Sequence, residues 1–214
     1  MKITAKNFKK KITPIILCGG KGERLKPLTI KTPKPLLKIN GNEILSYIIK
    51  HLLFYKLENI LVLSGYKKYK IKEFLQKNFK NKTSYLDTGL NRDILQRIKI
   101  AEKHCLEYIL ICYGDTLVNL DVNKLIKFHL INKADLSLSV YNQKISFGVV
   151  NIDESNNIKS FKEKPNLENW INIGFILVKK KKFFNISKKY KTFKSFLENL
   201  NRMGNIKAFR HNKN

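Results

Sequence analysis

A stretch rich in glycine and basic residues, directly after an apolar run, constrains this chain more than any other feature. Ile15 and Ile16 lead into residues 17–37, whose sequence is LCGGKGERLKPLTIKTPKPLL. Glycine lets backbone N–H groups approach an anion closely, while lysine and arginine neutralise the anion's charge. The three prolines of the stretch favour extended backbone beyond the turn. It therefore predicts a buried strand that leads into a phosphate-binding loop, with Arg24 and Lys34 reaching one ligand from two sides.

Two common phosphate-binding loops do not account for this stretch. The P-loop pattern G-x-x-x-x-G-K-[ST] is absent, and the dinucleotide pattern G-x-G-x-x-G fails because Leu25 occupies its last position. The landmark motifs of protein kinases are also absent. For the glycines alone, a surface turn rich in glycine and lysine is an equal alternative.

The composition fits one soluble globular domain over residues 1–214. Hydrophobic residues make up 43% of the chain, which is long enough for a substantial core. No apolar stretch reaches the length of a membrane span, and the apolar run near the N-terminus is too short for a signal peptide. Cys18, Cys105 and Cys112 have no metal-binding spacing, so we expect buried, reduced thiols and a cytoplasmic protein.

The charge of the chain is strongly positive. Lys and Arg number 43 against 16 Asp and Glu, for a formal net charge of +27. Such a chain attracts polyanions such as nucleic acids, anionic membranes or phosphorylated small molecules. The lysines are spread along the whole sequence, and no nucleic-acid-binding signature accompanies them. We therefore predict no specific nucleic-acid partner, and only incidental binding at low salt.

Apolar runs and helical periodicities alternate through the first part of the chain. Strands are expected at 13–18, 59–64, 84–86 and 107–112. Helices are expected at 43–57 (with Asn42 as N-cap), between the turn at 65–67 and residue 79, at 92–104 and at 122–130. This alternation predicts βαβ units and an α/β, Rossmann-like fold with a mostly parallel mixed sheet flanked by helices. The turns at 19–24, 65–67, 87–89 and 113–115 should converge on one sheet edge, where ligands bind. Residues 1–11 are expected to form a loose arm.

The later part of the chain has a different texture. Strands are expected at 135–140, 147–152, 158–162, 171–178 and 206–209, and helices at 180–187 and 192–203. Asn156 and Asn157 predict a hairpin turn between two of these strands. We expect this part to extend the first sheet and to close over the ligand.

Asp115 is the sharpest single candidate for chemistry. It ends a predicted buried strand and offers a hard oxygen ligand at the edge where a polyphosphate would lie. Mg²⁺ typically binds through one or two carboxylates together with substrate phosphates. Asp115 is therefore a candidate Mg²⁺ ligand; the alternative is that it caps a following helix.

The complete string resembles the signature of the sugar-phosphate nucleotidylyltransferases, roughly G-G-x-G-x-R-L-x-P-L-T, a short gap, and P-K-P-L. The likeness continues through 64–67 (SGYK), 87–89 (DTG), 113–115 (YGD), 147–148 (FG) and 161–165 (FKEKP), and covers about residues 13–210. It is strongest toward the glucose-1-phosphate cytidylyltransferase branch, and the G-Y-K, D-T-G and Y-G-D trio points to CTP. The resemblance implies a nucleotidyltransferase fold whose residues 13–131 bind nucleotide and whose residues 132–214 bind an acceptor.

The resemblance also implies roles for individual residues. The catalytic residues would be Arg24, Lys34 and Asp115, with Asp115 holding Mg²⁺. Nucleotide-binding residues would be Leu17, Cys18, Gly19, Gly20, Lys21, Gly22, Glu23, Asp87, Thr88, Gly89, Tyr113 and Gly114. Acceptor-binding residues would be Lys67, Glu163, Lys164 and Asn172; without the resemblance, Glu163 and Lys164 would be interpreted as a solvated strand end. Relatives often assemble, so a homo-oligomer is compatible with the resemblance.

The implied reaction transfers CMP from CTP to the phosphate of a small acceptor and releases pyrophosphate. A phosphate monoester is largely dianionic near neutral pH, so the reaction needs no histidine base or serine nucleophile. Positioning and charge neutralisation would supply the catalysis. Two alternatives of other classes are a catalytically inactive nucleotide-sensing protein and a nucleic-acid-binding protein.

Three departures from the pattern bear on the acceptor and the metal. Residues 90–93 lead directly into a predicted helix, where the hexose enzymes have a longer loop containing T-G-G-R. Ile173 replaces a glycine of an N-G-G pattern and would place a bulky side chain where a sugar needs room. The family's second metal-binding Asp lies beyond the region of Arg210, and the sequence given ends at Asn214. Either Asp115, phosphates and water would hold the metal, or the sequence given is part of a longer chain.

The first two departures favour an acceptor other than glucose 1-phosphate. The leading expectation is L-glutamine phosphate, which would give CDP-L-glutamine for capsule modification, by likeness to a phosphoglutamine-specific branch. Glucose 1-phosphate or another hexose 1-phosphate is the alternative.

Overall fold

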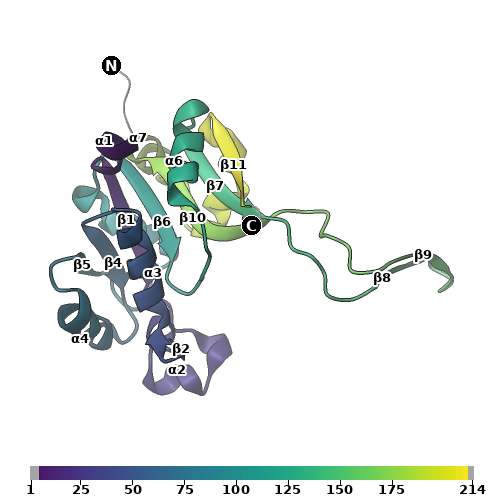
Figure 1. Cartoon of the computed structure of the whole chain (residues 1–214), viewed down its shortest axis with the longest axis horizontal. Coiled ribbons are helices and arrows are strands. Elements are labelled where there is room, and N and C mark those ends of the chain that lie inside the picture. The colour runs from purple at the N-terminus through teal and green to yellow at the C-terminus, as the bar shows by residue number, and fades with distance from the viewer. Residues whose placement is uncertain (1–4, 212–214) are drawn as a thin grey trace.

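A seven-stranded sheet forms the centre of the computed structural model, which describes residues 5–211 (Figure 1). The strand order is β11-β7-β10-β6-β1-β4-β5, and β10 alone runs antiparallel to its neighbours. The predicted α/β fold with a mostly parallel mixed sheet is therefore confirmed. The strands are β1 (Ile12–Cys18), β4 (Ile60–Ser64), β5 (Thr83–Asp87), β6 (Tyr108–Tyr113), β7 (Leu136–Tyr141), β10 (Ile171–Lys179) and β11 (Ile206–His211).

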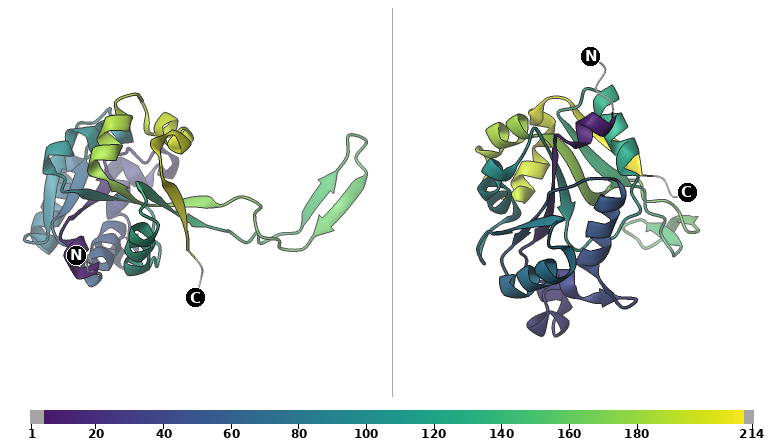
Figure 2. Two further views of the ribbon diagram at one scale, coloured as in Figure 1. Left: turned by 90° about the horizontal axis from the view of Figure 1, so that it is seen from above. Right: turned by 60° about the vertical axis from the view of Figure 1, so that its left-hand side comes forward.

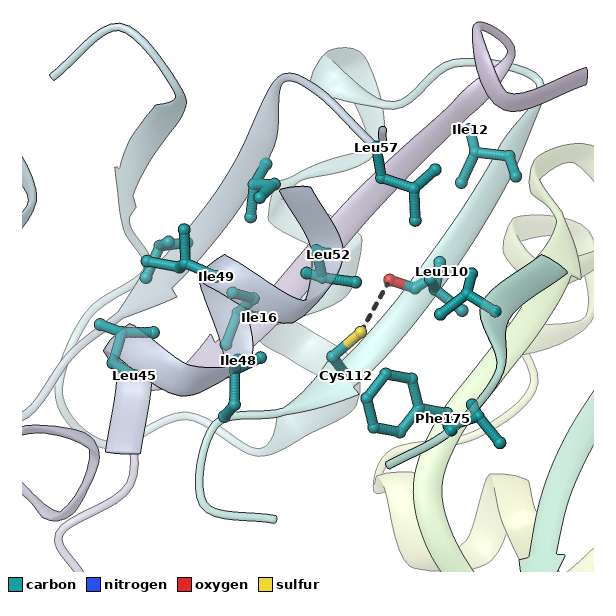
Figure 3. Packing of buried hydrophobic residues seen from close by; sticks show 14 of the residues in the cluster. Ile12, Ile16, Leu45, Ile48, Ile49, Leu52, Leu57, Leu110, Cys112 and Phe175 are labelled. Atoms are coloured by element: carbon teal, nitrogen blue, oxygen red, sulfur yellow. Dashed lines mark hydrogen bonds between the residues drawn. The ribbon is translucent and has the colours of Figure 1, made fainter. Parts of the chain in front are cut away.

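Helices cover both faces of this sheet because successive strand residues point to opposite sides. Ile16 belongs to the core cluster that takes in α3 (Ile44–Phe54), while its neighbour Ile15 belongs to the cluster that takes in α5 (Ile94–Ile100) (Figure 3). The first cluster also includes residues of α1 (Ala5–Lys9), α4 (Lys68–Phe79) and α6 (Val122–Ile131), and the second those of α7 (Lys180–Ser187) and α8 (Phe193–Glu198). Burial of both faces explains why these strands are nearly continuous apolar runs.

Short elements complete the chain between these helices and strands. They are α2 (Leu28–Lys31), β2 (Lys38–Ile39), β3 (Asn42–Glu43) and four 3₁₀ turns, η1 (Glu23–Leu25), η2 (Lys34–Leu36), η3 (Glu102–His104) and η4 (Leu200–Met203). The predicted helix at 92–104 ends at Ile100 and continues as η3, and the one at 192–203 likewise ends at Glu198 before η4. The predicted N-cap Asn42 is wrong: it lies in β3, and Glu43 precedes α3 without a side-chain capping bond.

The carboxyl ends of four parallel strands meet at one edge of the sheet. Cys18 is in register with Ser64, which is in register with Asp87, and Leu17 is in register with Tyr113. The turns that follow β1, β4, β5 and β6 therefore lie side by side, as the sequence predicts.

The N-terminal residues are not the loose arm that the sequence suggests. Residues 1–4 lie outside the described part, but α1 packs on the sheet, where Phe8 is fully buried with its ring centroid 4.4 Å from that of Tyr108. One large apolar side chain is enough to fix this short basic helix, because burial of a phenylalanine outweighs the polarity of its neighbours.

We expect Phe8→Ala to lower the free energy of unfolding by about 3–5 kcal/mol, since it leaves a cavity in the core. Urea unfolding followed by circular dichroism measures this value. A loss below about 1 kcal/mol would show that α1 is peripheral to the core.

A two-stranded hairpin projects far from the sheet instead of closing over it (Figures 1 and 2). It consists of β8 (Val149–Ile152) and β9 (Ile158–Lys162), and we call residues 142–170, which carry it, the arm. The Asn156 turn is confirmed, with φ of 65° at that residue. The prediction that the later part of the chain extends the first sheet is confirmed by β7, β10 and β11, but the prediction that it closes over the acceptor is wrong for the single chain. The hairpin has no helix on either face, so Phe147 and Phe161 remain 77% and 62% exposed.

Candidate functional site

A cavity of about 580 Å³ lies at the carboxyl ends of β1 and β6. The glycine loop between β1 and η1, the turn η2, the start of α5 and the end of β6 all contribute to it. Eleven of the predicted site residues line it: Leu17, Cys18, Gly19, Gly20, Gly22, Glu23, Arg24, Lys34, Tyr113, Gly114 and Asp115. The structure therefore brings together most of the predicted nucleotide-binding set and all three predicted catalytic residues.

The glycine loop is held open by a left-handed residue at its end. Gly22 has φ of 65°, a conformation that side chains other than glycine rarely adopt. The Thr29 hydroxyl and the Leu25 N–H both donate to the Gly22 carbonyl, at 2.9 Å each. Within residues 5–211, no group accepts a hydrogen bond from the backbone N–H groups of Gly20, Lys21 or Gly22. Consecutive free N–H groups beside a cavity form a binding site for an anion.

Lys34 and Asp115 face each other across the cavity although they are 81 residues apart in sequence. The Lys34 Nζ lies 2.5 Å from the Asp115 Oδ2, and both side chains are partly exposed. The proline-rich segment places Lys34 here, since Pro33 is extended and Pro35 is buried in η2. No helix begins at Asp115; Asp121 caps α6, so the alternative interpretation of Asp115 as a helix cap is excluded.

The charge of the cavity lining is positive. Arg24, Lys34, Arg92 and Arg97 line it together with only two acidic residues, Glu23 and Asp115. Cations at close range in a recessed site raise the local concentration of anionic ligands. The arrangement therefore suits a polyphosphate.

This cavity is not lined by the predicted nucleotide-binding residues Asp87, Thr88 and Gly89 or by the predicted acceptor-binding residue Lys67. Asp87, Gly89 and Lys67 line a smaller neighbouring cavity of about 280 Å³, and exposed Lys21 lines neither. Lys68 donates to Asp87 at 2.5 Å, and this bond is the main reason that the pKa of Asp87 is lowered.

Thr88 has a structural position. It is 2% exposed, and its hydroxyl donates to the Ser64 carbonyl at 2.6 Å. Both the hydroxyl and the N–H of Thr88 are therefore bonded within the protein, since the N–H also donates to the Ser64 carbonyl.

Asn172, a predicted acceptor-binding residue, does not itself line the cavity but hydrogen-bonds to Tyr113, which does. It donates from Nδ2 to the Tyr113 hydroxyl at 3.2 Å and accepts from the Gly174 N–H at 2.9 Å. The Ile173 side chain, expected to take up room that a sugar needs, belongs to the first core cluster and is 8% exposed.

Glu163 and Lys164 are the predicted residues that the single chain leaves apart from the cavity. Both lie on the arm, which projects away from the sheet (Figure 2). Their charged groups are 3.7 Å from each other, and both side chains are more than half exposed.

Sequence reasoning missed Arg92 and Arg97, which line the cavity from the start of α5. The signal for Arg97 was its position between Leu95 and Ile98, on the buried face of a short amphipathic helix. An arginine on a buried face calls for acceptors that a sequence pattern does not reveal.

Asp115 is the group in the cavity best suited to Mg²⁺. No cluster of three or more His, Cys, Asp or Glu side chains occurs within the described residues, so a metal ion would take one protein carboxylate and complete its shell with phosphate oxygens and water. Cys18, which also lines the cavity, is a poor ligand because burial strongly raises the pKa of its thiol. All three cysteines are buried and unpaired, as expected, and no helix in residues 5–211 could cross a membrane.

The chain is similar to several known proteins over most of its length. The nucleotidyl transferase family model matches residues 13–207. A Bacillus subtilis (strain 168) protein assigned as a glucose-1-phosphate cytidylyltransferase is 32% identical over 222 residues, which cover 92% of this chain and 87% of that protein. A glucose-1-phosphate adenylyltransferase of Trichlorobacter lovleyi is 28% identical, over 74% of this chain and 44% of its own length, so this chain spans less than half of that relative.

A solved structure has the same fold. It is assigned as a glucose-1-phosphate thymidylyltransferase from Bacillus anthracis in complex with a sucrose, with a TM-score of 0.74 and 21% identity. The similarity covers 94% of this chain and 87% of that chain.

Proposed function

The chain belongs to the nucleotidyl transferase family, and from this premise we propose that it transfers CMP from CTP to a small phosphorylated acceptor and releases pyrophosphate. The observation that carries the proposal is the cavity at the end of β1, whose lining combines a glycine loop with unbonded N–H groups and four cationic side chains. These groups suit the triphosphate that the reaction consumes.

Different residues of the cavity have different roles in the proposed reaction. The N–H groups of Gly20 to Gly22 bind phosphate oxygens, while Arg24 and Lys34 neutralise charge on the departing pyrophosphate. An oxygen of the acceptor phosphate forms a bond to the α-phosphorus as the bond from that phosphorus to the pyrophosphate oxygen breaks. The attacking oxygen of the acceptor phosphate is already anionic, so no residue has to remove a proton from it. Mg²⁺, when bound through Asp115, supplies further charge neutralisation.

CTP is favoured over other nucleotides by the D-T-G and Y-G-D motifs and by the cytidylyltransferase relative. For the acceptor, L-glutamine phosphate is the leading choice and CDP-L-glutamine its product, because α5 begins directly after the short segment 90–93. Glucose 1-phosphate is the second candidate, because one relative is assigned as a glucose-1-phosphate cytidylyltransferase and because the Ile173 side chain is mostly buried.

The acceptor end of the site is completed, in our proposal, by the arm of a second copy of the chain. Glu163 and Lys164 resemble the family's acceptor residues, but no residue of the arm lines the cavity of its own chain. The arm also exposes apolar side chains that a neighbouring subunit would cover, among them Phe147 and Phe161. A homo-oligomer that exchanges arms would satisfy both observations.

A pyrophosphate-release screen tests the proposed function. It crosses CTP, UTP, ATP, GTP and dTTP with L-glutamine phosphate, glucose 1-phosphate and other small phosphates, all with Mg²⁺. We expect CTP to be used at least about tenfold better than the other nucleotides, with L-glutamine phosphate the best acceptor. Release with glucose 1-phosphate alone would transfer the proposal to the second acceptor. No release with any pair, while CTP still binds, would indicate a nucleotide sensor.

A further inference from the structure

Arg97 is a buried cation without an acidic partner. Its residue is 3% exposed, and no carboxylate of the described residues lies within ion-pair distance of its guanidinium. Burying a charge in this way is costly unless hydrogen bonds compensate it. Burial is also the main factor that lowers the pKa of Arg97 and neighbouring Arg92 adds to it, while the more distant charges of Asp87 and Asp93 act in the opposite direction. A buried charge that lowers the stability of the fold in this way indicates a functional role for Arg97.

The guanidinium joins the turns that follow three parallel strands. From α5, it donates to the Gly19 carbonyl after β1 at 3.1 Å and to the Ser64 carbonyl at the end of β4 at 3.2 Å. In the turn after β5 it donates to the Thr88 hydroxyl at 2.7 Å, the Gly89 carbonyl at 2.6 Å and the Leu90 carbonyl at 2.9 Å. The glycine loop and the 88–90 turn are thus tied to the same rigid planar group.

The Arg97 guanidinium leaves no room for a side chain at Gly19. A Cβ atom added to Gly19 would lie 2.4 Å from the Arg97 Cζ and Nη1 atoms, a separation that real side chains do not tolerate. The guanidinium therefore sits directly against the first glycine of the loop, at the floor of the cavity that Arg97 itself lines.

We propose that Arg97 is a positioning residue that fixes the distance between the phosphate-binding glycine loop and the 88–90 turn, and that this fixed distance lets the site select the base of its nucleotide. The unpaired charge of Arg97 also favours a polyphosphate ligand. This inference rests on the proposed function, with the triphosphate at the glycine loop, and adds that the base of the nucleotide lies against the 88–90 turn. Lysine cannot replace the arginine, because a single ammonium does not reach five acceptors in a fixed planar geometry.

The test compares Arg97→Lys and Arg97→Met with Ile98→Val, a matched control on the same helix whose side chain packs in the core instead. In Arg97→Lys, the ratio of kcat/KM for CTP to that for UTP should fall by about tenfold or more. Ile98→Val destabilises the fold but should leave this ratio unchanged. A purely structural role of Arg97 would lower both rates in proportion, and an unchanged ratio would overturn the inference.

Binding of inorganic triphosphate, measured by calorimetry, tests the charge separately. Its affinity should fall by about tenfold in Arg97→Met and change little in Arg97→Lys, which keeps the charge. Equal affinity for the Arg97→Met variant and wild type would refute the electrostatic part. Because this probe needs no turnover, it decides the point even if the wild type transfers no nucleotide and the proposed function fails.

Gly19→Ala provides a second route if the Arg97 variants do not fold. Its added methyl group displaces the guanidinium while leaving the arginine in the chain. We expect the same fall in base selectivity. Retained selectivity in a folded Gly19→Ala protein would contradict the inference.

Discussion

Asp115→Ala should lower the rate of pyrophosphate release by about 10³-fold or more, with little change in thermal stability. The Asp115 side chain is partly exposed and its protein partner is the Lys34 ammonium, so its removal costs the fold little. In the reaction it is the carboxylate in the cavity best placed to hold Mg²⁺, and its loss leaves the metal with phosphates and water alone. Steady-state assays at saturating CTP and acceptor measure the effect.

Glu107→Ala is the matched control for this experiment. Glu107 is an exposed carboxylate that also pairs with a lysine, Lys11, but at the opposite edge of the sheet. Its removal should leave the rate within about twofold of wild type, as expected for a surface ion pair. Full activity of Asp115→Ala would refute the assignment of Asp115 as the metal ligand. Among the described residues, Glu23 is the one other carboxylate that lines the cavity.

Mixing two inactive variants should restore activity if the arm serves the cavity of another copy. Lys164→Ala is expected to lower the rate by about 10²-fold, because it removes the acceptor-binding cation of the arm. Asp115→Ala has a defective cavity but an intact arm. After the two are co-expressed, half of the cavities are intact, and an intact arm serves half of those. The mixture should therefore recover about a quarter of wild-type activity.

The same mixing experiment excludes the alternative of an arm that folds back on its own chain. In that case each chain would carry one defective half of its site, and the mixture would remain inactive. Lys189→Ala, a change of an exposed lysine on the body, is the control and should be fully active alone. A monomer in analytical ultracentrifugation that is nevertheless active would also contradict arm exchange.

Much of the fold could be predicted because its signals are local. The apolar run ending in Cys18 and the periodicity of α7, whose range 180–187 was predicted to the residue, depend only on neighbours in sequence. The convergence of the strand-end turns follows from the parallel topology, so Arg24 and Asp115 could be placed together before any coordinates. Lys34 was predicted from its motif.

The features that escaped prediction depend on tertiary contacts. The basic segment of α1 is ordered by the burial of Phe8 against Tyr108, which no local pattern shows. Arg97 finds its acceptors on three separate turns, and Ile173 turns into the core because of its place in β10. The alternating residues of the arm predicted its strands correctly, but a local pattern does not give the direction of the arm in space.

A crystal structure of the protein with Mg²⁺ and a non-hydrolysable CTP analogue tests the central claim most directly. The account predicts the triphosphate against the N–H groups of Gly20 to Gly22, with Arg24 and Lys34 in contact with its oxygens and the metal beside Asp115. A nucleotide bound elsewhere, or a glycine loop that stays empty at saturating analogue, would contradict it.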